Sequence, residues 1–355
     1  MATSISSNIP ALVFSYELDE ISFFTDLPRL TIRVSWYGET LFQTTLYAFE
    51  FKASFFNANE IVEMLMKEKK LSFTKFSVEY LDDDELLGEL ELNVIYCAHN
   101  LGIDAALFAE QHFLTTLEQK VIAPNSTALL AFYHDREEAV PSVNCVFYDR
   151  NNTFYSTAIQ LPTMSFSMPG VHNMTIETNA VLASLADLGY NDVQLASFSV
   201  AVGLRQFAFY ISDVKPDVEF SFLNIFNVPE VASFSAVTTA KTSVDRSIAK
   251  LRNKAVFYNQ QTEKSYDVQT APIHRSVAMW VEQIFESADV RLGNNFALDE
   301  LPEIIITDST AEISDNDAEL NRVKFSWRFA EERVHHFFDA HSARIFQQQF
   351  TTQFS

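Results

Sequence analysis

The sequence repeats one strand–turn–strand pattern at a nearly constant spacing. In each copy, two runs of β-branched, aromatic or other apolar residues flank a polar turn. The copies lie at Val34–Phe42, Val143–Tyr155 and Lys254–Val268. The tyrosines that enter the turns are Tyr37, Tyr148 and Tyr258, so the spacings are 148 − 37 = 111 and 258 − 148 = 110 residues. Solenoid repeats are far shorter, so this period predicts tandem domains.

The same order of elements follows each copy of the pattern. Apolar residues at helical spacing come first, and two further strand-like runs come next. The expected helices are Glu60–Lys67, Asn179–Gly189 and Ile273–Glu286. The expected strand pairs are Phe73–Tyr80 with Leu90–Cys97, Val193–Val202 with Phe207–Ser212, and Glu303–Thr307 with Val323–Phe329. We therefore predict a mainly β chain of three tandem β-sandwich-like modules, each with one short helix. Unrelated β-sandwiches in series also place hairpins about every hundred residues, and this alternative stays open.

These patterns also predict where the modules begin and end. The expected divisions are module 1 at 1–112, a connector at 113–138, module 2 at 139–221, a connector at 222–248, module 3 at 249–329 and a C-terminal arm at 330–355. In the arm, Phe346, Phe350 and Phe354 are four residues apart and would form one stripe on a helix. Such a stripe either packs on its own module or docks on a neighbouring subunit.

Charge and targeting signals narrow the class of protein. The chain of 355 residues carries 47 acidic and 25 basic residues, a net charge of −22, which repels phosphate backbones and disfavours nucleic-acid binding. No apolar run reaches the length of a membrane span, so no membrane contact is expected. No Lys or Arg precedes Arg29, so the start of the sequence lacks the basic region of a signal peptide, and cytoplasmic synthesis is expected. Cys97 and Cys145 each lie in an apolar run and are expected to be buried free thiols.

The sequence offers few groups for catalysis or cofactor binding. Its seven glycines are too scattered for a phosphate-binding loop. The residues weighed as metal ligands are His335, His336, Asp339 and His341, the partial calcium-loop pattern Asp315, Asp317 and Glu319, and the run Asp82–Glu85. None has the spacing of a complete site, so solvated polar surface is the preferred interpretation. We assign no catalytic, cofactor-binding or metal-binding residue, and we expect no cofactor and no small-molecule substrate.

The three tryptophans are the candidates for a carbohydrate-binding platform. Trp36, Trp280 and Trp327 each stand beside other apolar residues in an expected strand or helix. Large aromatic side chains in such positions belong to the core far more often than to a binding face. Core packing is therefore the prediction for all three.

Three segments of the chain resemble tail proteins of phages and prophages of gut Bacteroidetes. They are Phe220–Glu230, Lys254–Thr270 and the stretch from Ile304–Asp308 through Trp327–Phe329. Proteins of that group carry Phe-x-Asn, an aromatic residue and Gly before such a hairpin, whereas Asn227 stands here in place of that Gly. The resemblance implies a non-enzymatic virion component, a tail, adaptor or baseplate ring subunit. Its implied partners are further copies of itself and neighbouring phage structural proteins, and its implied location is the virion.

Two other functions remain open from the sequence. A module that binds glycans or a host surface would use the loops at the sandwich ends, near Asp82 or Asp315. A hydrolase on a β scaffold would need acidic residues that only folding brings together. We predict an assembly subunit first, a binding module second and a hydrolase third.

Overall fold

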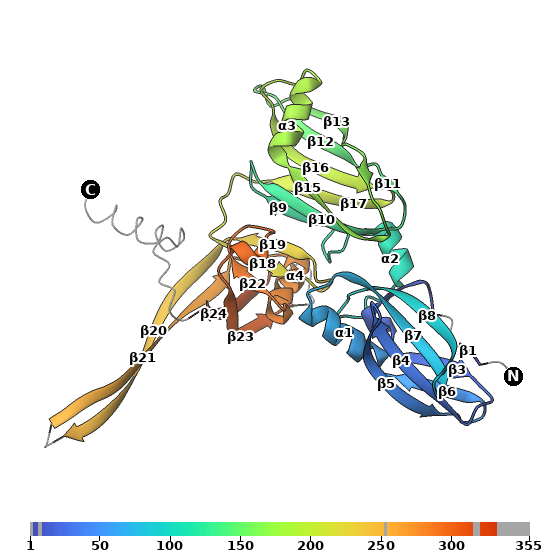
Figure 1. Cartoon of the computed structure of the whole chain (residues 1–355). Coiled ribbons are helices and arrows are strands. Elements are labelled where there is room, and N and C mark those ends of the chain that lie inside the picture. The colour runs from blue at the N-terminus through green and yellow to red at the C-terminus, as the bar shows by residue number, and fades with distance from the viewer. Residues whose placement is uncertain (1–2, 6–8, 252–253, 315–319, 332–355) are drawn as a thin grey trace. The chain divides into compact units, whose positions relative to one another are not determined.

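The computed structural model describes residues 3–5, 9–251, 254–314 and 320–331 (Figure 1). The chain is mainly β, with 54% strand and 15% helix, arranged as several sheets with a few short helices. The predicted fold class is therefore confirmed. The phenylalanine stripe predicted at Phe346, Phe350 and Phe354 lies outside the described residues.

The chain forms two compact units, which are described separately. Unit 1 comprises Met1–Asp213 together with Asn224–Val228, and unit 2 comprises Val214–Leu223 together with Pro229–Ser355. The short segment Asn224–Val228 connects two strands of unit 2 but belongs to unit 1.

The first sandwich of unit 1 packs two sheets and a helix around one core. Its five-stranded sheet has the order β2-β8-β7-β4-β5, and its three-stranded sheet has the order β1-β3-β6. The elements are β1 (Ser4–Ile5), β2 (Leu12–Phe14), β3 (Glu20–Phe24), β4 (Arg29–Trp36), β5 (Glu39–Tyr47), β6 (Lys52–Phe56), α1 (Ala58–Glu68), β7 (Phe73–Asp82) and β8 (Glu85–Ile95), with a 3-10 turn at Ser15–Glu17. Leu30, Ile32 and Val34 alternate into the core as their period of two predicts. Val62 and Met66 of α1 complete the core from the helix side.

The second sandwich of unit 1 has the same topology. Its larger sheet has the order β13-β12-β16-β17-β9, and β10 pairs with β15. The elements are α2 (Ala105–Gln111), β9 (Gln119–Ile122), β10 (Thr127–His134), β11 (Glu138–Ala139), β12 (Ser142–Tyr148), β13 (Phe154–Gln160), β14 (Met164–Ser165), β15 (Gly170–Glu177), α3 (Thr178–Asp187), β16 (Gln194–Val202) and β17 (Arg205–Ile211). In both sandwiches the first hairpin strand pairs with the strand after the helix, β4 with β7 and β12 with β16. In both, the last strand also pairs in parallel with a short early strand, β8 with β2 and β17 with β9.

Unit 2 joins its strands differently. Its sheets have the orders β19-β18-β22 and β20-β21-β24-β23. The elements are β18 (Val218–Leu223), β19 (Pro229–Phe234), β20 (Ala236–Leu251), β21 (Lys254–Thr270), α4 (Arg275–Glu286), β22 (Val290–Leu292), β23 (Ile304–Glu312) and β24 (Arg322–Phe329), with a 3-10 turn at Leu298–Glu300. Here the second hairpin strand, β21, pairs with the last strand, β24. In the predicted third copy, α4, β23 and β24 follow one another as expected, but the strand pairing differs.

The hairpin predicted within Lys254–Val268 is wrong. These residues form one continuous strand, β21, which pairs with β20 from Ala236↔Thr270 to Leu251↔Lys254. The polar residues after Tyr258, which suggest a turn in the sequence, lie within the strand. In a two-stranded ribbon both faces can meet water, so polar residues occur inside the strand and no longer mark its end.

The segments predicted as connectors contain strands. Residues 113–138 supply β9 and β10 to the second sandwich, and residues 222–248 contain β19 and most of β20. The boundaries of the three predicted modules stay a prediction.

Candidate interaction surfaces

All three tryptophans take part in packing. Trp280 is buried, and its indole Nε1 donates to Glu230 Oε2 at 2.8 Å. Trp327 is buried and stacks on Tyr266 with ring centroids 4.3 Å apart. Trp36 is half-buried and donates to Thr74 Oγ1 at 2.9 Å. The prediction of core packing is confirmed for Trp280 and Trp327, and Trp36 packs against the core of the first sandwich.

The acidic run Asp82–Glu85 forms the turn between β7 and β8. Asp83 has a positive φ of 52° and pairs with the Arg29 guanidinium at 2.6 Å, with both side chains mostly exposed. In the part of the chain that the structure describes, no three His, Cys, Asp or Glu side chains are grouped so that they could hold a metal ion. The histidine cluster from His335 to His341 and the run Asp315–Glu319 lie outside that part.

Cys97 and Cys145 are buried free thiols, as predicted. Burial raises the pKa of Cys97 to about 12 and that of Cys145 to about 11. The Cys97 thiol also lies 3.1 Å from the carbonyl oxygen of His99, to which it donates. Both thiols are therefore protonated and shielded near neutral pH.

The native protein should not react with a disulfide reagent. At pH 8 we expect no thiol release from Ellman's reagent over an hour, because the thiolate is the nucleophile and both sulfurs are buried. In denaturant, two thiols per chain should react at once. Rapid reaction of one thiol in the native protein would contradict the burial of that cysteine.

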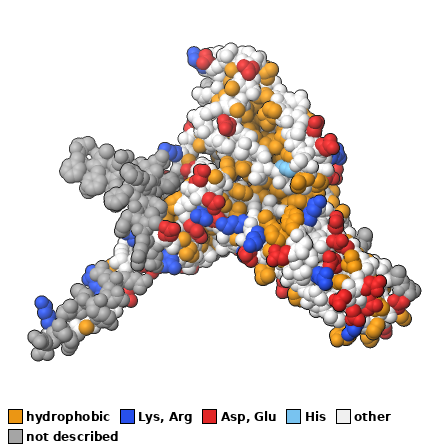
Figure 2. All heavy atoms as spheres, viewed as in Figure 1, with side chains coloured by type: hydrophobic (Ala, Val, Ile, Leu, Met, Phe, Trp, Pro, Cys, Tyr) orange, Lys and Arg blue, Asp and Glu red, His pale blue; other side chains and the backbone are white. Residues whose placement is uncertain are grey.

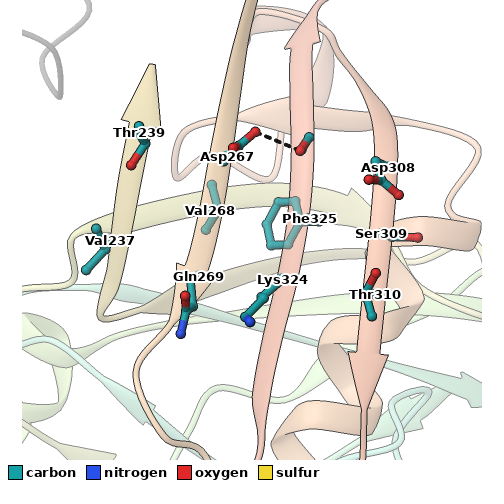
Figure 3. Close-up of a pocket in the computed structure, with 11 residues that line it drawn as sticks. Val237, Thr239, Asp267, Val268, Gln269, Asp308, Ser309, Thr310, Lys324 and Phe325 are labelled. Carbon is teal, nitrogen blue, oxygen red and sulfur yellow. Dashed lines mark hydrogen bonds between the residues drawn. The ribbon is translucent and has the colours of Figure 1, made fainter. Parts of the chain in front are cut away.

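A shallow polar depression of about 370 Å³ lies on the four-stranded sheet of unit 2 (Figure 3). Its outer face carries two rows of paired residues across the strands. They are Thr239, Asp267, Ser326 and Asp308 in one row and Val237, Gln269, Lys324 and Thr310 in the other. The hydrogen bonds from Lys241 and Ser326 hold the pKa of Asp267 below its usual range. This carboxylate is therefore ionised near neutral pH and is already paired with Lys241 and Ser326.

The ribbon formed by β20 and β21 is largely exposed along β20, where most of the described residues face solvent. Among the described residues, β21 pairs with β24 only over Tyr266–Gln269, so the rest of the ribbon has no third strand. Figure 1 shows it running away from the four-stranded sheet. Arg328–Glu263 at 2.8 Å and the ion pair Lys241–Asp267 fix its base.

The ribbon exposes apolar side chains that its own unit does not cover. Val237, Val244 and Ile248 are 72%, 42% and 60% exposed. Unpaired strand edges with apolar side chains favour association with another chain. This surface is not evident from the sequence, because the predicted connector 222–248 and the predicted hairpin at Lys254–Val268 divide the ribbon between them. The uninterrupted strand residues on both sides of Arg252-Asn253 were the available signal.

Comparison with known proteins identifies no relative from which a function could be inferred. No protein-family model matches the chain, and no curated protein matches it. Among solved structures, the plexin A4 extracellular region matches 94% of this chain with a TM-score of 0.22 and 6% identity. Tripeptidyl peptidase 2 matches 92% of it with a TM-score of 0.16 and 6% identity. This chain spans 40% and 31% of those two chains, and at such TM-scores neither likeness carries an argument.

The α-helices of the described residues are 7 to 12 residues long. Within the described residues, none is both long enough and apolar enough to cross a bilayer.

Proposed function

We propose that this chain is a non-enzymatic structural protein of a phage virion, a subunit of an oligomeric ring in the tail, neck or baseplate. Its partners would be further copies of itself and the neighbouring structural proteins of the particle. The resemblance of Phe220–Glu230 and Lys254–Thr270 to phage tail proteins supports this choice of class.

The observation that carries the proposal is the long exposed ribbon. A two-stranded ribbon is at best marginally stable by itself in water, and strands of 16 and 17 residues are far longer than usual. A docking partner would cover its unpaired edges and its exposed Val244 and Ile248.

Antibody labelling of virus particles tests the proposal. An antibody against the purified chain should label one fixed position on particles from the source culture. The purified chain should also form rings in negative-stain images and exceed its 40.4 kDa monomer mass by light scattering. Removing residues 342–355 should weaken the rings if the C-terminal arm docks on a neighbour. Unlabelled particles together with a monomeric chain would rule the proposal out.

A glycan array separates this proposal from the second candidate. A surface-binding module should bind particular glycans, and substitutions in the exposed Asp82–Glu85 turn should abolish that binding. An assembly subunit should bind none of the glycans on the array. Specific glycan binding by a monomeric chain would favour the second candidate.

A further inference from the structure

We propose that the β20–β21 ribbon of one copy docks on the acidic, aromatic end of the first sandwich of a second copy. This inference names the contact that would build the proposed ring, so it rests on the proposed function. Its evidence is the charge of the ribbon, the charge of the receiving end, and a strained aromatic turn at that end.

The ribbon has the opposite charge to the rest of the chain. Residues 241–264 contain six Lys or Arg and two Asp or Glu, which gives 6 − 2 = +4, whereas the whole chain carries −22. The remainder therefore carries −22 − 4 = −26. Lys241 and Glu263 form ion pairs at the base of the ribbon. Without these two, the segment has five basic residues and one acidic residue, a charge of 5 − 1 = +4. Such a ribbon is attracted to acidic surfaces, and this chain supplies them.

The receiving end is formed by three chain reversals of the first sandwich. They are residues 24–29 between β3 and β4, 47–52 between β5 and β6, and 82–85 between β7 and β8. Tyr47 pairs with Arg29 in the sheet, and Arg29 bonds to Asp83, so these reversals meet. Their charged residues are Asp26, Glu50, Asp82, Asp83, Asp84 and Glu85 against Arg29 and Lys52, a balance of 2 − 6 = −4. This balance is equal and opposite to that of the ribbon.

Exposed aromatic side chains share this end with the acids. Phe24, Tyr47, Phe49 and Phe51 are 49%, 80%, 77% and 68% exposed. The Thr25 amide donates to the Phe51 carbonyl at 3.0 Å, which places the first and second reversals side by side. Figure 2 shows acidic and hydrophobic side chains intermixed on the part of the molecule that carries β1, β3 and β6. Aromatic faces bind Lys and Arg, so the two features favour the same kind of partner.

The turn that presents these aromatics is strained. Glu50 and Phe51 have φ values of 49° and 65°, and Phe49 and Lys52 close the turn with bonds of 2.8 and 2.9 Å. Two-residue turns of this kind usually take Asn-Gly, because a bulky side chain in the left-handed region is strained. Strain of this kind clusters at binding sites. Holding Phe51 exposed at that cost is explained if another molecule covers it.

A second copy explains the ribbon better than nucleic acid does. A phosphate backbone would also attract the ribbon, but the net charge of −26 on the rest of the chain would repel it. A second copy is also acidic overall, but it presents an end that matches the ribbon both in charge and in exposed aromatic faces for its Lys and Arg side chains. The contact is heterologous, so it generates a ring where its rotation closes.

Charge reversal on the full chain tests the proposal. The ribbon variant is Arg246→Glu, Lys254→Glu, Lys264→Glu, and the receiving variant is Glu50→Lys, Asp84→Lys, Glu85→Lys. Each alone should weaken self-association at least about 100-fold by sedimentation equilibrium, since like charges then face each other. The sixfold variant, which restores opposite charges, should associate within about 10-fold of the wild type.

The control substitutes Glu118→Lys, Glu138→Lys and Asp187→Lys, which are exposed acids of the second sandwich. It changes the net charge as much as the receiving variant does and should leave association unchanged. A sixfold variant no better than the ribbon and receiving variants, or a wild type that stays monomeric, would overturn the proposal. Binding of a 30-base-pair duplex that the ribbon variant loses, with self-association unaltered, would reassign the ribbon to nucleic acid. If antibody still labels virus particles after either of these two results, the ribbon contact is wrong but the chain remains a virion protein.

Discussion

Replacing Arg205 with alanine is expected to lower the free energy of unfolding of unit 1 by about 3–5 kcal/mol. Arg205 begins β17 and is 8% exposed, so its guanidinium is held in the interior of the second sandwich. Burial lowers the pKa of Arg205, yet an arginine stays charged at any pH near neutrality. The structure must therefore satisfy a buried cation.

Backbone carbonyls and one ring satisfy this cation. Arg205 Nε donates to Ala109 O at 2.7 Å, Nη2 to Tyr133 O at 2.7 Å, and Nη1 to Val202 O at 3.5 Å. The guanidinium carbon lies 5.3 Å from the centre of the Phe132 ring. Ala109 lies in the last turn of α2, where carbonyls lack helical partners and a cation is favoured. One side chain thus joins α2, β10 and β17.

Alanine at position 205 removes the hydrogen bonds and leaves a large cavity, so both effects destabilise. Lysine keeps the charge but cannot donate in several fixed directions, and we expect it to cost about 2 kcal/mol or more. The thermal midpoint of the alanine variant should fall by roughly 10 °C. Hydrogen exchange read by mass spectrometry should show lost protection in peptides of α2 and β10, with peptides of β23 and β24 unchanged.

Arg150→Ala is the matched control for this prediction. Arg150 pairs with Asp192 at 3.1 Å, and its side chain is 78% exposed. Exposed ion pairs contribute about 0–1 kcal/mol, so this variant should resemble the wild type. An Arg205→Ala protein as stable as Arg150→Ala would show that the buried arginine is dispensable.

Local patterns in the sequence predicted the individual elements well. Helical spacing located α1, α3 and α4, and alternation located strands such as β4 and β16. The expected turn at Tyr37-Gly38 is present, with φ values of 47° and 82°. These features depend on neighbours within a few residues, which a single sequence contains.

Strand pairing and buried polar contacts could not be predicted in the same way. Unit 2 pairs β21 with β24, where the sandwiches of unit 1 pair the other hairpin strand, and no local pattern distinguishes the two choices. Arg205 precedes alternating residues and resembles a solvent-facing strand end until its partners Ala109 and Tyr133 are known. The helix α2 was missed although Asp104 caps it by accepting from the Leu107 amide at 2.8 Å. Its seven residues are too few for a periodic signal.

The candidate interaction surfaces also combine local features that the sequence shows with distant contacts that it does not show. The sequence showed the acidic run Asp82–Glu85 but not the aromatic residues near it, because these come from other strands. The charge of the ribbon was readable from residues 241–264, but only as a sum over a segment whose limits the fold defines.

Asn227→Ala is expected to lower the free energy of unfolding of unit 1 by about 3 kcal/mol. Asn227 is 6% exposed and has a φ of 55°, the left-handed conformation that Gly and Asn accept best. Its side-chain amide donates to Met66 O at 3.1 Å and to Leu71 O at 3.2 Å. Alanine loses both bonds and adds backbone strain.

Glycine at position 227 should separate the two causes. It accepts the conformation but loses both bonds, so we expect a loss of about 2 kcal/mol, between the wild type and alanine. Asn152 is the matched control, since it has a φ of 59° but is exposed in the turn between β12 and β13. At position 152, alanine should lower the free energy of unfolding by about 1 kcal/mol and glycine should hardly change it, because only the backbone conformation is affected. Hydrogen exchange of peptides from unit 1 measures all four variants. If Asn227→Gly proves as stable as Asn152→Gly, the two buried bonds contribute nothing and the asparagine serves the backbone alone.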